Sequence, residues 1–336
     1  MRAIALISGG LDSTLATKLM QDLGIELVAL NTVSPFCLCN HHSAKGCFHG
    51  AASVSKELGI RLVSINVAEE ILEIVKKPKH GYGSNMNPCI DCRILLFKKA
   101  KELMRQEGAS FVITGEVLGQ RPMSQMRRTM TLIEGEAQLT DLVLRPLSAK
   151  VLEPTIPERE GWVPRDKLLA ISGRGRKDQF ALAGALGVKD FPCPSGGCLL
   201  TDPEFSKRLR DLMRHTSDFT LNDIFLLKLG RHFRLSKGVK LIVGRNEQEN
   251  KNILSLALAQ DHLFMAPEDT AGPTALGRGV FNDELLTRSC RIVARYCDLN
   301  GSSEADIVYG NTGTVPPLAK LKVFPLDEAG LMPLRI

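Results

Sequence analysis

Alternating strand and helix patterns in the first half of the chain constrain its fold more than any other feature. Short apolar runs and amphipathic runs follow one another, and glycines stand where the helical patterns end. The expected strands are Ala3–Ile7, Ile25–Leu30, Ile60–Ile65 and Phe111–Thr114, and the expected helices are Asp12–Leu23, Gly50–Leu58 and Cys89–Gln106. Because strands joined through helices pair in parallel, this order predicts an α/β fold with a doubly wound, mainly parallel sheet.

The second half of the chain differs from the first in composition and in the order of its predicted elements. Residues 155–178 are rich in proline, glycine and charge, and they predict a connection that contains a short helix. Farther on, the sequence predicts a helix near Leu221–Leu229, a hairpin that turns at Ser236–Gly238, and helices at Asn246–Leu258 and Asp283–Tyr296. We therefore expect two domains, residues 1–205 and a smaller α+β domain at residues 216–336.

Composition limits the classes of protein to which the chain can belong. Of its 336 residues, 44% are hydrophobic and 24% are charged, which is typical of a soluble protein. The first apolar run, Arg2–Ile7, is too short to span a membrane and lacks the layout of a signal peptide. The nine cysteines are an odd number, so we expect reduced thiols in a cytoplasm, some of them in metal or sulfur chemistry. The net charge of +6 permits a polyanionic partner without requiring one.

The segment Ser8-Gly9-Gly10-Leu11-Asp12-Ser13 lies between the first expected strand and the first expected helix. Backbone N–H groups in such a turn form a cradle for phosphate oxygens, and glycine lets the backbone approach them closely. Ser8 and Ser13 can add hydroxyl donors. Asp12 repels a phosphate unless a cation lies between them, and Mg²⁺ is the expected ion. The alternative is a Gly-Gly turn in which Asp12 or Ser13 only caps the helix.

This segment resembles the PP-loop of the N-type ATP pyrophosphatases, a family that includes the tRNA thiouridine synthases. Members adenylate a carbonyl oxygen, release pyrophosphate and let a nucleophile expel AMP. Thr114-Gly115-Glu116 resembles the Thr-Gly-His element that closes the nucleotide pocket of thiouridylases, with Glu116 in place of histidine. The resemblance implies an ATP site made by Ser8, Gly9, Gly10, Asp12, Ser13, Thr114 and Gly115. Arg145-Pro146-Leu147 and Lys150 also resemble a thiouridine synthase stretch and are expected to face the same cleft.

Two cysteine-containing segments bear on the chemistry. Cys89 and Cys92 begin the longest expected helix, where the helix dipole and the neighbouring Arg93 favour thiolate over thiol. Cys193 and Cys198 enclose a Ser-Gly-Gly turn far downstream. Two of these thiols could carry a persulfide, three could hold a 4Fe-4S cluster with one iron open to sulfide, or all four could bind a structural zinc. Inert buried thiols are the remaining alternative.

The same segments resemble the Asn-Pro-Cys-x-x-Cys stretch of tRNA 2-thiouridylases. They are also similar to the Cys-x-x-Cys and distant cysteine of cluster-dependent tRNA 4-thiouridine synthases. By that resemblance Cys89, Cys92 and Cys198 are the catalytic cysteines and the three cluster ligands, with Cys193 as a spare thiol. Because the sequence shows no rhodanese-like domain, the expected sulfur donor is free sulfide or a separate persulfide carrier.

A third group of thiols follows the second expected strand, at the edge where doubly wound sheets bind ligands. It consists of Cys37, Cys39 and Cys47, with histidines nearby. Cysteine and histidine suit zinc, so this is a candidate zinc site. The alternative is a loop beside the nucleotide whose thiols have no special role. Cys290 and Cys297 are spaced as on one helix face and are expected in a core.

Basic residues suggest contacts with RNA in both halves of the chain. Arg121, Arg127 and Arg128 are candidates for contacts with an RNA backbone, and ordinary solvated charges are the alternative. Residues 231–252 resemble the RNA-binding domain of the NFACT family, with its aromatic-Arg pair, hairpin and Val-Gly-Arg-Asn motif. That resemblance implies a basic face for phosphates, made by Arg231, Arg234, Lys240 and Arg245. The alternative is a small α/β domain with an ordinary hairpin.

The two resemblances together imply an ATP-dependent tRNA sulfurtransferase that forms AMP and pyrophosphate. It would adenylate a uridine carbonyl oxygen and then transfer sulfur to give thiouridine, with 4-thiouridine preferred over 2-thiouridine on resemblance alone. The implied partners are tRNA and a sulfur donor but no membrane, and an oligomer is left open. Two other hypotheses remain: a PP-loop synthetase that uses ammonia or an amine and carries structural zinc, and a non-catalytic RNA-binding protein that senses nucleotide.

Overall fold

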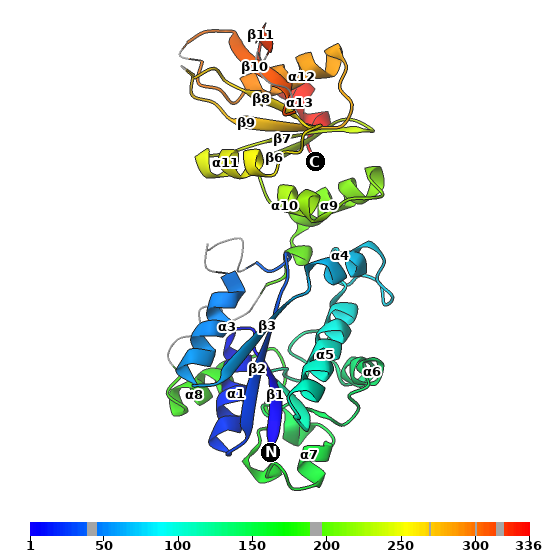
Figure 1. The fold of residues 1–336 in the computed structure, drawn as a ribbon, viewed down its shortest axis with the longest axis vertical. Helices are drawn as coiled ribbons and strands as arrows, with labels where there is room; N and C mark the ends of the chain where they lie inside the picture. The colour runs from blue at the N-terminus through cyan, green and yellow to red at the C-terminus, as the bar shows by residue number, and fades with distance from the viewer. Residues whose placement is uncertain (39–45, 189–196, 269, 300, 314–318) are drawn as a thin grey trace. The chain divides into compact units, whose positions relative to one another are not determined.

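The chain folds into two compact units, Met1–Asp202 and Pro203–Ile336. The computed structural model describes residues 1–38, 46–188, 197–268, 270–299, 301–313 and 319–336, and it does not describe the side chains of residues 46–49. Figure 1 shows the elements of both units along the chain. Within the described residues, no helix is long and apolar enough to cross a membrane.

The first unit is built on a parallel sheet. Its strands are β1 (Arg2–Leu6), β2 (Glu26–Val33), β3 (Arg61–Asn66), β4 (Phe111–Thr114) and β5 (Val143–Leu144). They lie in the order β3-β2-β1-β4-β5, and every neighbouring pair is parallel. The strand order therefore reverses between β1 and β4, which is where doubly wound sheets bind ligands. The predicted fold class is confirmed.

Helices cover both faces of this sheet (Figure 1). One face carries α1 (Leu11–Asp22), α3 (Gly46–Glu57) and α8 (Lys177–Ala185), and the other carries α5 (Cys89–Gln106) and α6 (Arg127–Ala137). Successive residues of β1 point to opposite faces, as the strand period of two requires. Ala3 and Ala5 pack in a core with Met20 of α1, whereas Ile4 packs with Phe97 of α5.

The remaining elements of the first unit are short. They are α4 (Ala68–Lys76), α7 (Ile156–Arg159) and the 3₁₀ turns Ala149–Val151, Arg165–Lys167 and Leu199–Thr201. The structure has α5 and β4 at the bounds that the sequence predicts, while α3 begins four residues earlier than expected. Helix α4 follows β3 almost directly and was not predicted from the sequence.

The second unit is an antiparallel sheet with helices. Its strands are β6 (Arg231–Ser236), β7 (Val239–Val243), β8 (His262–Met265), β9 (Thr274–Arg278), β10 (Ala305–Asn311) and β11 (Ala319–Val323), in the order β11-β10-β8-β9-β7-β6. Its helices are α9 (Pro203–His215), α10 (Leu221–Leu227), α11 (Glu247–Ser255), α12 (Asp283–Ala294) and α13 (Glu328–Leu331), followed by a 3₁₀ turn at Met332–Leu334. Helix α9 lies largely between the two domain ranges expected from the sequence.

Local sequence signals account for several elements of the second unit. The expected hairpin is β6–β7, which turns at Lys237-Gly238. Asn246 and Asn282 cap α11 and α12, since their side chains accept hydrogen bonds from backbone N–H groups three residues on. Cys290 is fully buried in the core, and Cys297 packs against it while partly exposed.

Candidate functional site

The phosphate loop begins where β1 ends and runs into α1. Gly9 has a φ of 74°, and a Cβ there would lie 2.6 Å from the carbonyl carbon of Gly50, so only glycine fits. The Ser13 hydroxyl donates to the Gly10 carbonyl at 2.9 Å, and the Ser8 N–H donates to Ser13 Oγ at 3.3 Å. These contacts hold the turn in a fixed shape at the N-terminus of α1, the end of a helix that favours phosphate.

The turn after β4 packs directly on this loop. A Cβ on Gly115 would overlap the backbone of Asp12 and Ser13. Glycine at this position therefore permits the contact between the carboxyl ends of β1 and β4. The resemblance to a pocket-closing Thr-Gly element thus has a steric basis in this chain.

Asp12 is a half-buried carboxylate with an incomplete set of partners. Its Oδ2 accepts a hydrogen bond from Gln120 Nε2 at 2.9 Å, whereas Oδ1 is buried without a hydrogen-bond partner. Burial raises the pKa of this carboxyl, and Gln120, Arg176 and Arg121 oppose the shift. A buried carboxylate oxygen without a partner, beside a phosphate cradle, suits a hard cation such as Mg²⁺.

Backbone pairing brings Cys198 to the beginning of α5. On one side Leu38 N–H donates to Gly197 O at 3.1 Å and Leu199 N–H donates to Phe36 O at 2.7 Å, which makes an isolated bridge between Cys37 and Cys198. On the other side Met86 N–H donates to Leu200 O at 3.0 Å. The segment with Cys198 is therefore held between the end of β2 and the loop that precedes Cys89.

One cavity of the first unit unites the phosphate loop and the cysteines. Its volume is about 320 Å³. Its lining includes the phosphate-loop and β4-turn residues Ser8, Gly10, Asp12, Ser13, Thr114 and Gly115, the cysteines Cys37, Cys89, Cys92 and Cys198, and the polar residues Arg93, Glu116, Arg121, Ser124, Gln125 and Arg176. Gly9, expected at the ATP site, is not in the lining and instead packs against Gly50. Cys193 lies outside the described residues.

Burial dominates the acidity of two of these thiols. It raises the pKa of Cys92 to about 12, with the nearby Cys198 adding to the effect and Arg93 opposing it. Burial also raises the pKa of Cys198 to about 11. For Cys92, Arg93 favours the thiolate as expected, but burial outweighs it and the pKa is raised. Part of the reason is that the Arg93 guanidinium is paired with Glu116, at 3.0 Å from Nε to Oε1.

The thiols differ in how they suit metals. Among the described residues, no group of three or more Cys, His, Asp or Glu converges on a single ion. Cys89, Cys92 and Cys198 nevertheless line one cavity, and thiolate is the donor that iron–sulfur clusters take. Cys37, expected as a zinc ligand, is disulfide-bonded. Cys39 and the side chain of Cys47 lie outside the described residues.

Four charged side chains form a network that runs inward from the cavity wall and that was not predicted from the sequence. Arg145 Nε lies 3.0 Å from Glu116 Oε2, and Arg145 also pairs with Glu134 of α6. Arg93 pairs with the other oxygen of Glu116. Arg145, expected to face the cleft, is only 5% exposed and does not line the cavity, because both carboxylates draw it inward.

The candidate RNA contacts of the first unit have different surroundings. Arg121 lines the cavity. Arg127 donates to the carbonyl of Val151 at 2.6 Å, and Arg128 is exposed. Lys150, also expected at the cleft, donates instead to the Asp166 carbonyl at 2.7 Å and is not in the lining.

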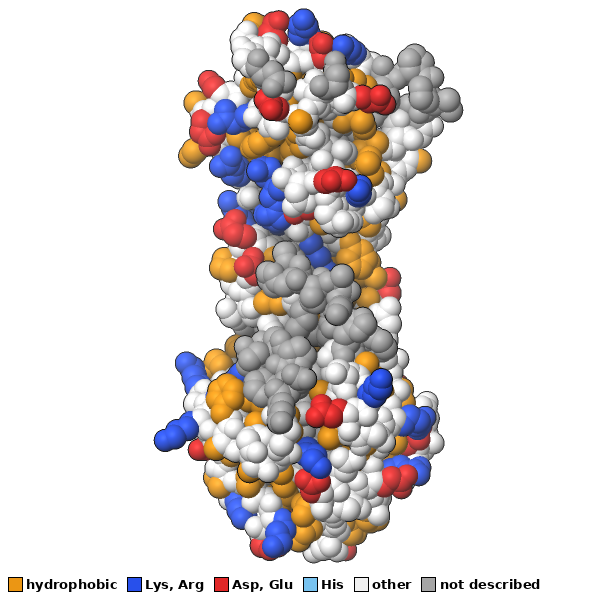
Figure 2. Space-filling model, turned by 90° about the vertical axis from the view of Figure 1, so that its left-hand side faces the viewer, with side chains coloured by type: hydrophobic (Ala, Val, Ile, Leu, Met, Phe, Trp, Pro, Cys, Tyr) orange, Lys and Arg blue, Asp and Glu red, His pale blue; other side chains and the backbone are white. Residues whose placement is uncertain are grey.

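The basic residues of the β6–β7 hairpin have partners within the second unit. Arg234 Nη2 lies 2.5 Å from Asp211 of α9, and Lys240 Nζ lies 3.7 Å from the same carboxylate. Arg245 pairs with Glu249 at 2.5 Å, and the Arg231 guanidinium lies 4.5 Å from the centre of the Tyr296 ring. Lys240 is 7% exposed, so the hairpin does not present all four charges to solvent. On the face in Figure 2, basic side chains of this unit gather beside acidic ones.

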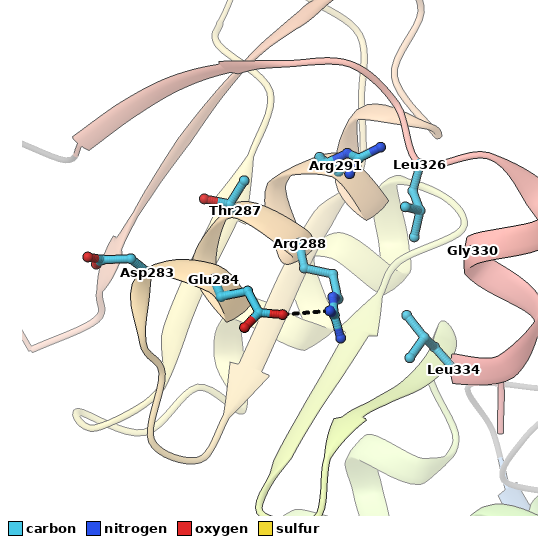
Figure 3. Close-up of a pocket in the computed structure, with 8 residues that line it drawn as sticks. All are labelled: Asp283, Glu284, Thr287, Arg288, Arg291, Leu326, Gly330 and Leu334. Carbon is cyan, nitrogen blue, oxygen red and sulfur yellow. Dashed lines mark hydrogen bonds and ion pairs between the residues drawn. The ribbon is translucent and has the colours of Figure 1, made fainter.

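The second unit has a cavity of its own, of about 660 Å³, between α12 and the segment around α13 (Figure 3). Its lining combines both signs of charge, and Arg288 Nη2 pairs with Glu284 Oε1 at 2.7 Å across its wall. It contains neither cysteine nor histidine.

Comparison with known proteins bears on both units. Residues 1–151 match the family described as thiamine biosynthesis protein (ThiI), and residues 230–330 match the NFACT protein RNA-binding domain. The chain is 26% identical over 34% of its length to a tRNA-specific 2-thiouridylase MnmA 1 of Caldanaerobacter subterraneus. It is 27% identical over 44% of its length to a probable tRNA sulfurtransferase of Thermococcus kodakarensis. These matches span 34% and 36% of the two relatives, or about a third of each.

Among solved structures, the chain resembles one described as a 4-thiouridine synthetase–RNA complex with bound ATP. The TM-score is 0.36 at 21% identity, over 56% of this chain and 51% of the other. Such a partial superposition carries no argument about function. The family matches rest on the sequence instead: residues 1–151 are similar to the ThiI family of PP-loop sulfurtransferases and residues 230–330 to the NFACT RNA-binding domain, which confirms both resemblances drawn from the motifs.

Proposed function

We propose that the chain is an ATP-dependent tRNA sulfurtransferase that forms AMP and pyrophosphate. The observation that carries this proposal is the shared cavity. The phosphate loop and the cysteines Cys89, Cys92 and Cys198 all line it. Activation by ATP and attack by sulfur must occur on the same carbon atom, so the two sets of groups have to lie together. The printed names of the relatives, a tRNA 2-thiouridylase and a tRNA sulfurtransferase, support the same reaction class.

The first step is adenylation. ATP binds with its phosphates on Ser8–Ser13, and Mg²⁺ on Asp12 offsets the charge between the carboxylate and the phosphates. A uridine flipped out of the tRNA presents a ring carbonyl oxygen to the α-phosphorus. A bond forms between that oxygen and phosphorus, and pyrophosphate leaves. The carbonyl oxygen thereby becomes part of a good leaving group.

The second step is sulfur transfer. A sulfur nucleophile attacks the activated ring carbon, the carbon–oxygen bond breaks, and AMP departs with the oxygen. Cys89, Cys92 and Cys198 would hold a 4Fe-4S cluster, which supplies an open iron on which a sulfide can be held. Burial raises the pKa of Cys92 and of Cys198, so binding of iron at these thiols would release their protons.

The two units divide the work. We assign adenylation and sulfur transfer to residues 1–205, and affinity for tRNA to residues 216–336. The match of residues 230–330 to an RNA-binding domain supports the second assignment. Arg121 lines the cavity and is suited to contact the backbone beside the flipped base. The sulfur donor is a sulfide or a persulfide carrier, and the proposed location is the cytoplasm.

The test is mass spectrometry of tRNA nucleosides from a strain that lacks the gene, together with AMP formation by the purified protein. Loss of 4-thiouridine in the deletion strain, restored by the gene, is the expected result. Loss of 2-thiouridine instead would still support a sulfurtransferase, but one that places sulfur on carbon 2 of the uridine ring. AMP formation that consumes ammonia or an amine would contradict thiolation in favour of an amine-using synthetase. ATP turnover with no modified nucleoside would favour an RNA-binding nucleotide sensor.

A further inference from the structure

Glu116 lies between the two groups of residues that the proposed reaction needs. It follows Gly115, which packs on the backbone of Asp12 and so ties the β4 turn to the phosphate loop. Its Oε1 lies 3.0 Å from Arg93 Nε, and Arg93 directly follows Cys92 in α5. Glu116 is 2% exposed and lines the cavity. One buried carboxylate is therefore adjacent both to the phosphate loop and to the helix that carries two of the cysteines.

Two arginines pair with Glu116 and fix its orientation. Arg145 Nε lies 3.0 Å from Glu116 Oε2, and Arg145 is itself held by Glu134 of α6. The contact of Arg93 with Glu116 Oε1 is an ion pair that is not aligned as a hydrogen bond, so Oε1 accepts no hydrogen bond from the described residues. A carboxylate only accepts hydrogen bonds, and its two oxygens offer about four acceptor sites. Glu116 Oε1 can therefore accept a hydrogen from a ligand in the cavity.

Ser124 and Gln125 give a second indication of a polar ligand in this cavity. Both line it and are 1% and 5% exposed, yet neither Ser124 Oγ nor Gln125 Oε1 has a hydrogen-bond partner among the described residues. The backbone holds this segment in place, since Gly119 N–H donates to the Gln125 carbonyl at 2.7 Å and Gln125 N–H donates to the Arg121 carbonyl at 3.0 Å. Buried polar atoms are normally paired, so a ligand is expected to supply their partners.

The adenylation of uridine requires a group that accepts a proton. The ring nitrogen N3 carries a hydrogen and is bonded to both carbonyl carbons. When either carbonyl oxygen bonds to the α-phosphorus, the ring becomes positively charged and N3–H becomes a strong acid. A carboxylate within hydrogen-bond reach is then a sufficient base. The requirement is the same whether sulfur is placed on carbon 2 or on carbon 4, because N3 adjoins both.

We propose that Glu116 accepts the N3 proton of the target uridine during adenylation and returns it when sulfur replaces AMP, while Ser124 and Gln125 hydrogen-bond with the same edge of the ring. In the first step the oxygen–phosphorus bond forms, pyrophosphate leaves, and the proton passes from N3 to Glu116 Oε1. This inference rests on the proposed function, because uridine loses this proton only if its carbonyl oxygen is activated.

The second step reverses the transfer at Glu116. A sulfur nucleophile, written as hydrosulfide, adds to the activated ring carbon, and Glu116 gives its proton back to N3. The carbon–oxygen bond then breaks, and AMP leaves with the electron pair of that bond. The S–H proton is released as the carbon–sulfur double bond forms. Glu116 thus ends the cycle as the carboxylate with which it began.

The test is adenylation by Glu116→Gln in the full chain, measured as AMP formed in a single turnover with ATP, Mg²⁺, sulfide and tRNA from the deletion strain. The rate should fall on the order of a hundredfold, as for the loss of a general base. ATP affinity, measured by calorimetry without tRNA, should not change. A loss of ATP affinity of the same size as the loss of rate would assign Glu116 to the nucleotide and overturn the proposal.

Glu134→Gln is the matched control for the ion pairs. It also removes a carboxylate that pairs with Arg145, but Glu134 does not line the cavity. Its melting temperature should fall as that of Glu116→Gln does, while most of the adenylation rate remains. Equal losses of rate in the two variants would show that the network acts only through structure, which would contradict a role of Glu116 in proton transfer.

Chemical rescue separates a proton acceptor from a structural carboxylate. Glu116→Ala leaves space for a small molecule, and formate should restore adenylation in proportion to its concentration, whereas formamide, which has a similar size but is not a base, should not. Equal restoration by both, or by neither, would overturn the proposal. If Glu116→Gln thiolates tRNA as fast as the wild-type protein, this inference alone fails. If the wild-type protein forms no AMP with tRNA, the proposed function itself fails.

Discussion

Single atoms decide the shape of the nucleotide site, and Gly115 shows this most directly. Because a Cβ at Gly115 would overlap the backbone of Asp12, Gly115→Ala must push the β4 turn away from the phosphate loop. We expect a loss of about 1–3 kcal/mol in unfolding free energy and weaker ATP binding. Gly135→Ala is the control, since a Cβ there meets nothing within 4 Å and the residue lies in α6. It should gain about 0.5–1 kcal/mol. Denaturant titration and ATP binding measure both variants.

Asp12 gives a second prediction at this scale. Asp12→Asn keeps the shape of the side chain, and its amide oxygen can still accept the hydrogen bond from Gln120. The substitution removes the negative charge that would hold Mg²⁺. AMP formation should fall on the order of a hundredfold, with the melting temperature nearly unchanged. Asp22→Asn, at the exposed end of the same helix, should leave AMP formation intact. Turnover by Asp12→Asn equal to that of Asp22→Asn would remove the phosphate-loop assignment.

The burial of Lys240 leads us to expect that the unfolding free energy depends on pH. Burial lowers the pKa of Lys240 to about 7. Arg234 and Arg208 also lower this pKa, whereas Asp211 and Asp223 raise it. The unfolded chain then binds more protons than the native one between about pH 7 and the ordinary lysine pKa. The unfolding free energy should therefore rise with pH across that window, on the order of a few kcal/mol.

The Lys240 prediction is measured as a difference between variants. Lys240→Met should abolish the rise in unfolding free energy with pH, whereas Lys237→Met in the exposed turn should keep it. Calorimetric melting of the whole chain between pH 7 and 10 gives the comparison, because other groups that titrate in this range are common to all three proteins. A rise of equal size in Lys240→Met would show that another group causes it.

At the scale of elements, local sequence determined much of the first unit. The bounds of α5 and β4 were predictable because Pro88 stands directly before the helix and Gly108 stands in the short loop between the helix and the strand. The strands after β7 were not predicted. β8 and β9 are four and five residues long, too short to show a clear alternation.

The candidate site was predictable only in part, for the same reason. A phosphate loop and a helix-initial Cys-x-x-Cys are local patterns, and the edge rule for parallel sheets brings them together. The ion pairs of Glu116 and Arg145 join segments 29 residues apart, and Gln179 meets Asp12 only through the packing of α8 on α1. Nothing in the local sequence marks such contacts. The burial of Cys92, which outweighs the effect of Arg93 on its pKa, is likewise nonlocal.

The cysteine-bearing elements carry the next prediction. Cys89→Ala, Cys92→Ala and Cys198→Ala should each lower tRNA thiolation by on the order of a hundredfold and spare ATP binding, since the nucleotide contacts lie on other elements. Protein purified without oxygen should be brown, and each variant should lose the colour. Cys297→Ala, in the second unit, should keep both activity and colour.

The colour and the activity also separate the three readings of these cysteines. Colourless anaerobic protein with full activity would eliminate the cluster and leave a persulfide carried by two thiols. Stoichiometric zinc with activity retained after Cys198→Ala would contradict both the cluster and the persulfide.

For the whole molecule, the division into two units makes a prediction about how tRNA affinity is distributed. The chain can be ended after Asp202, where the compact first unit ends. Every lining residue of the first cavity precedes this point, so ATP binding should persist and serves as the check that the truncated protein is folded. Affinity for tRNA should fall, because the segment similar to an RNA-binding domain is gone.

The salt dependence of tRNA binding tests the same division more sharply than affinity alone. Each basic side chain that neutralises a phosphate releases a counterion, so the slope of log K against log salt reports the number of such contacts. Many basic side chains of the second unit, among them Arg234 and Arg245, are paired with carboxylates, and these must exchange an internal partner for a phosphate. The full chain should therefore bind tRNA with a steeper slope than the chain ended after Asp202. Equal slopes and equal affinities in the two proteins would place the RNA contacts in the first unit, around Arg121, Arg127 and Arg128.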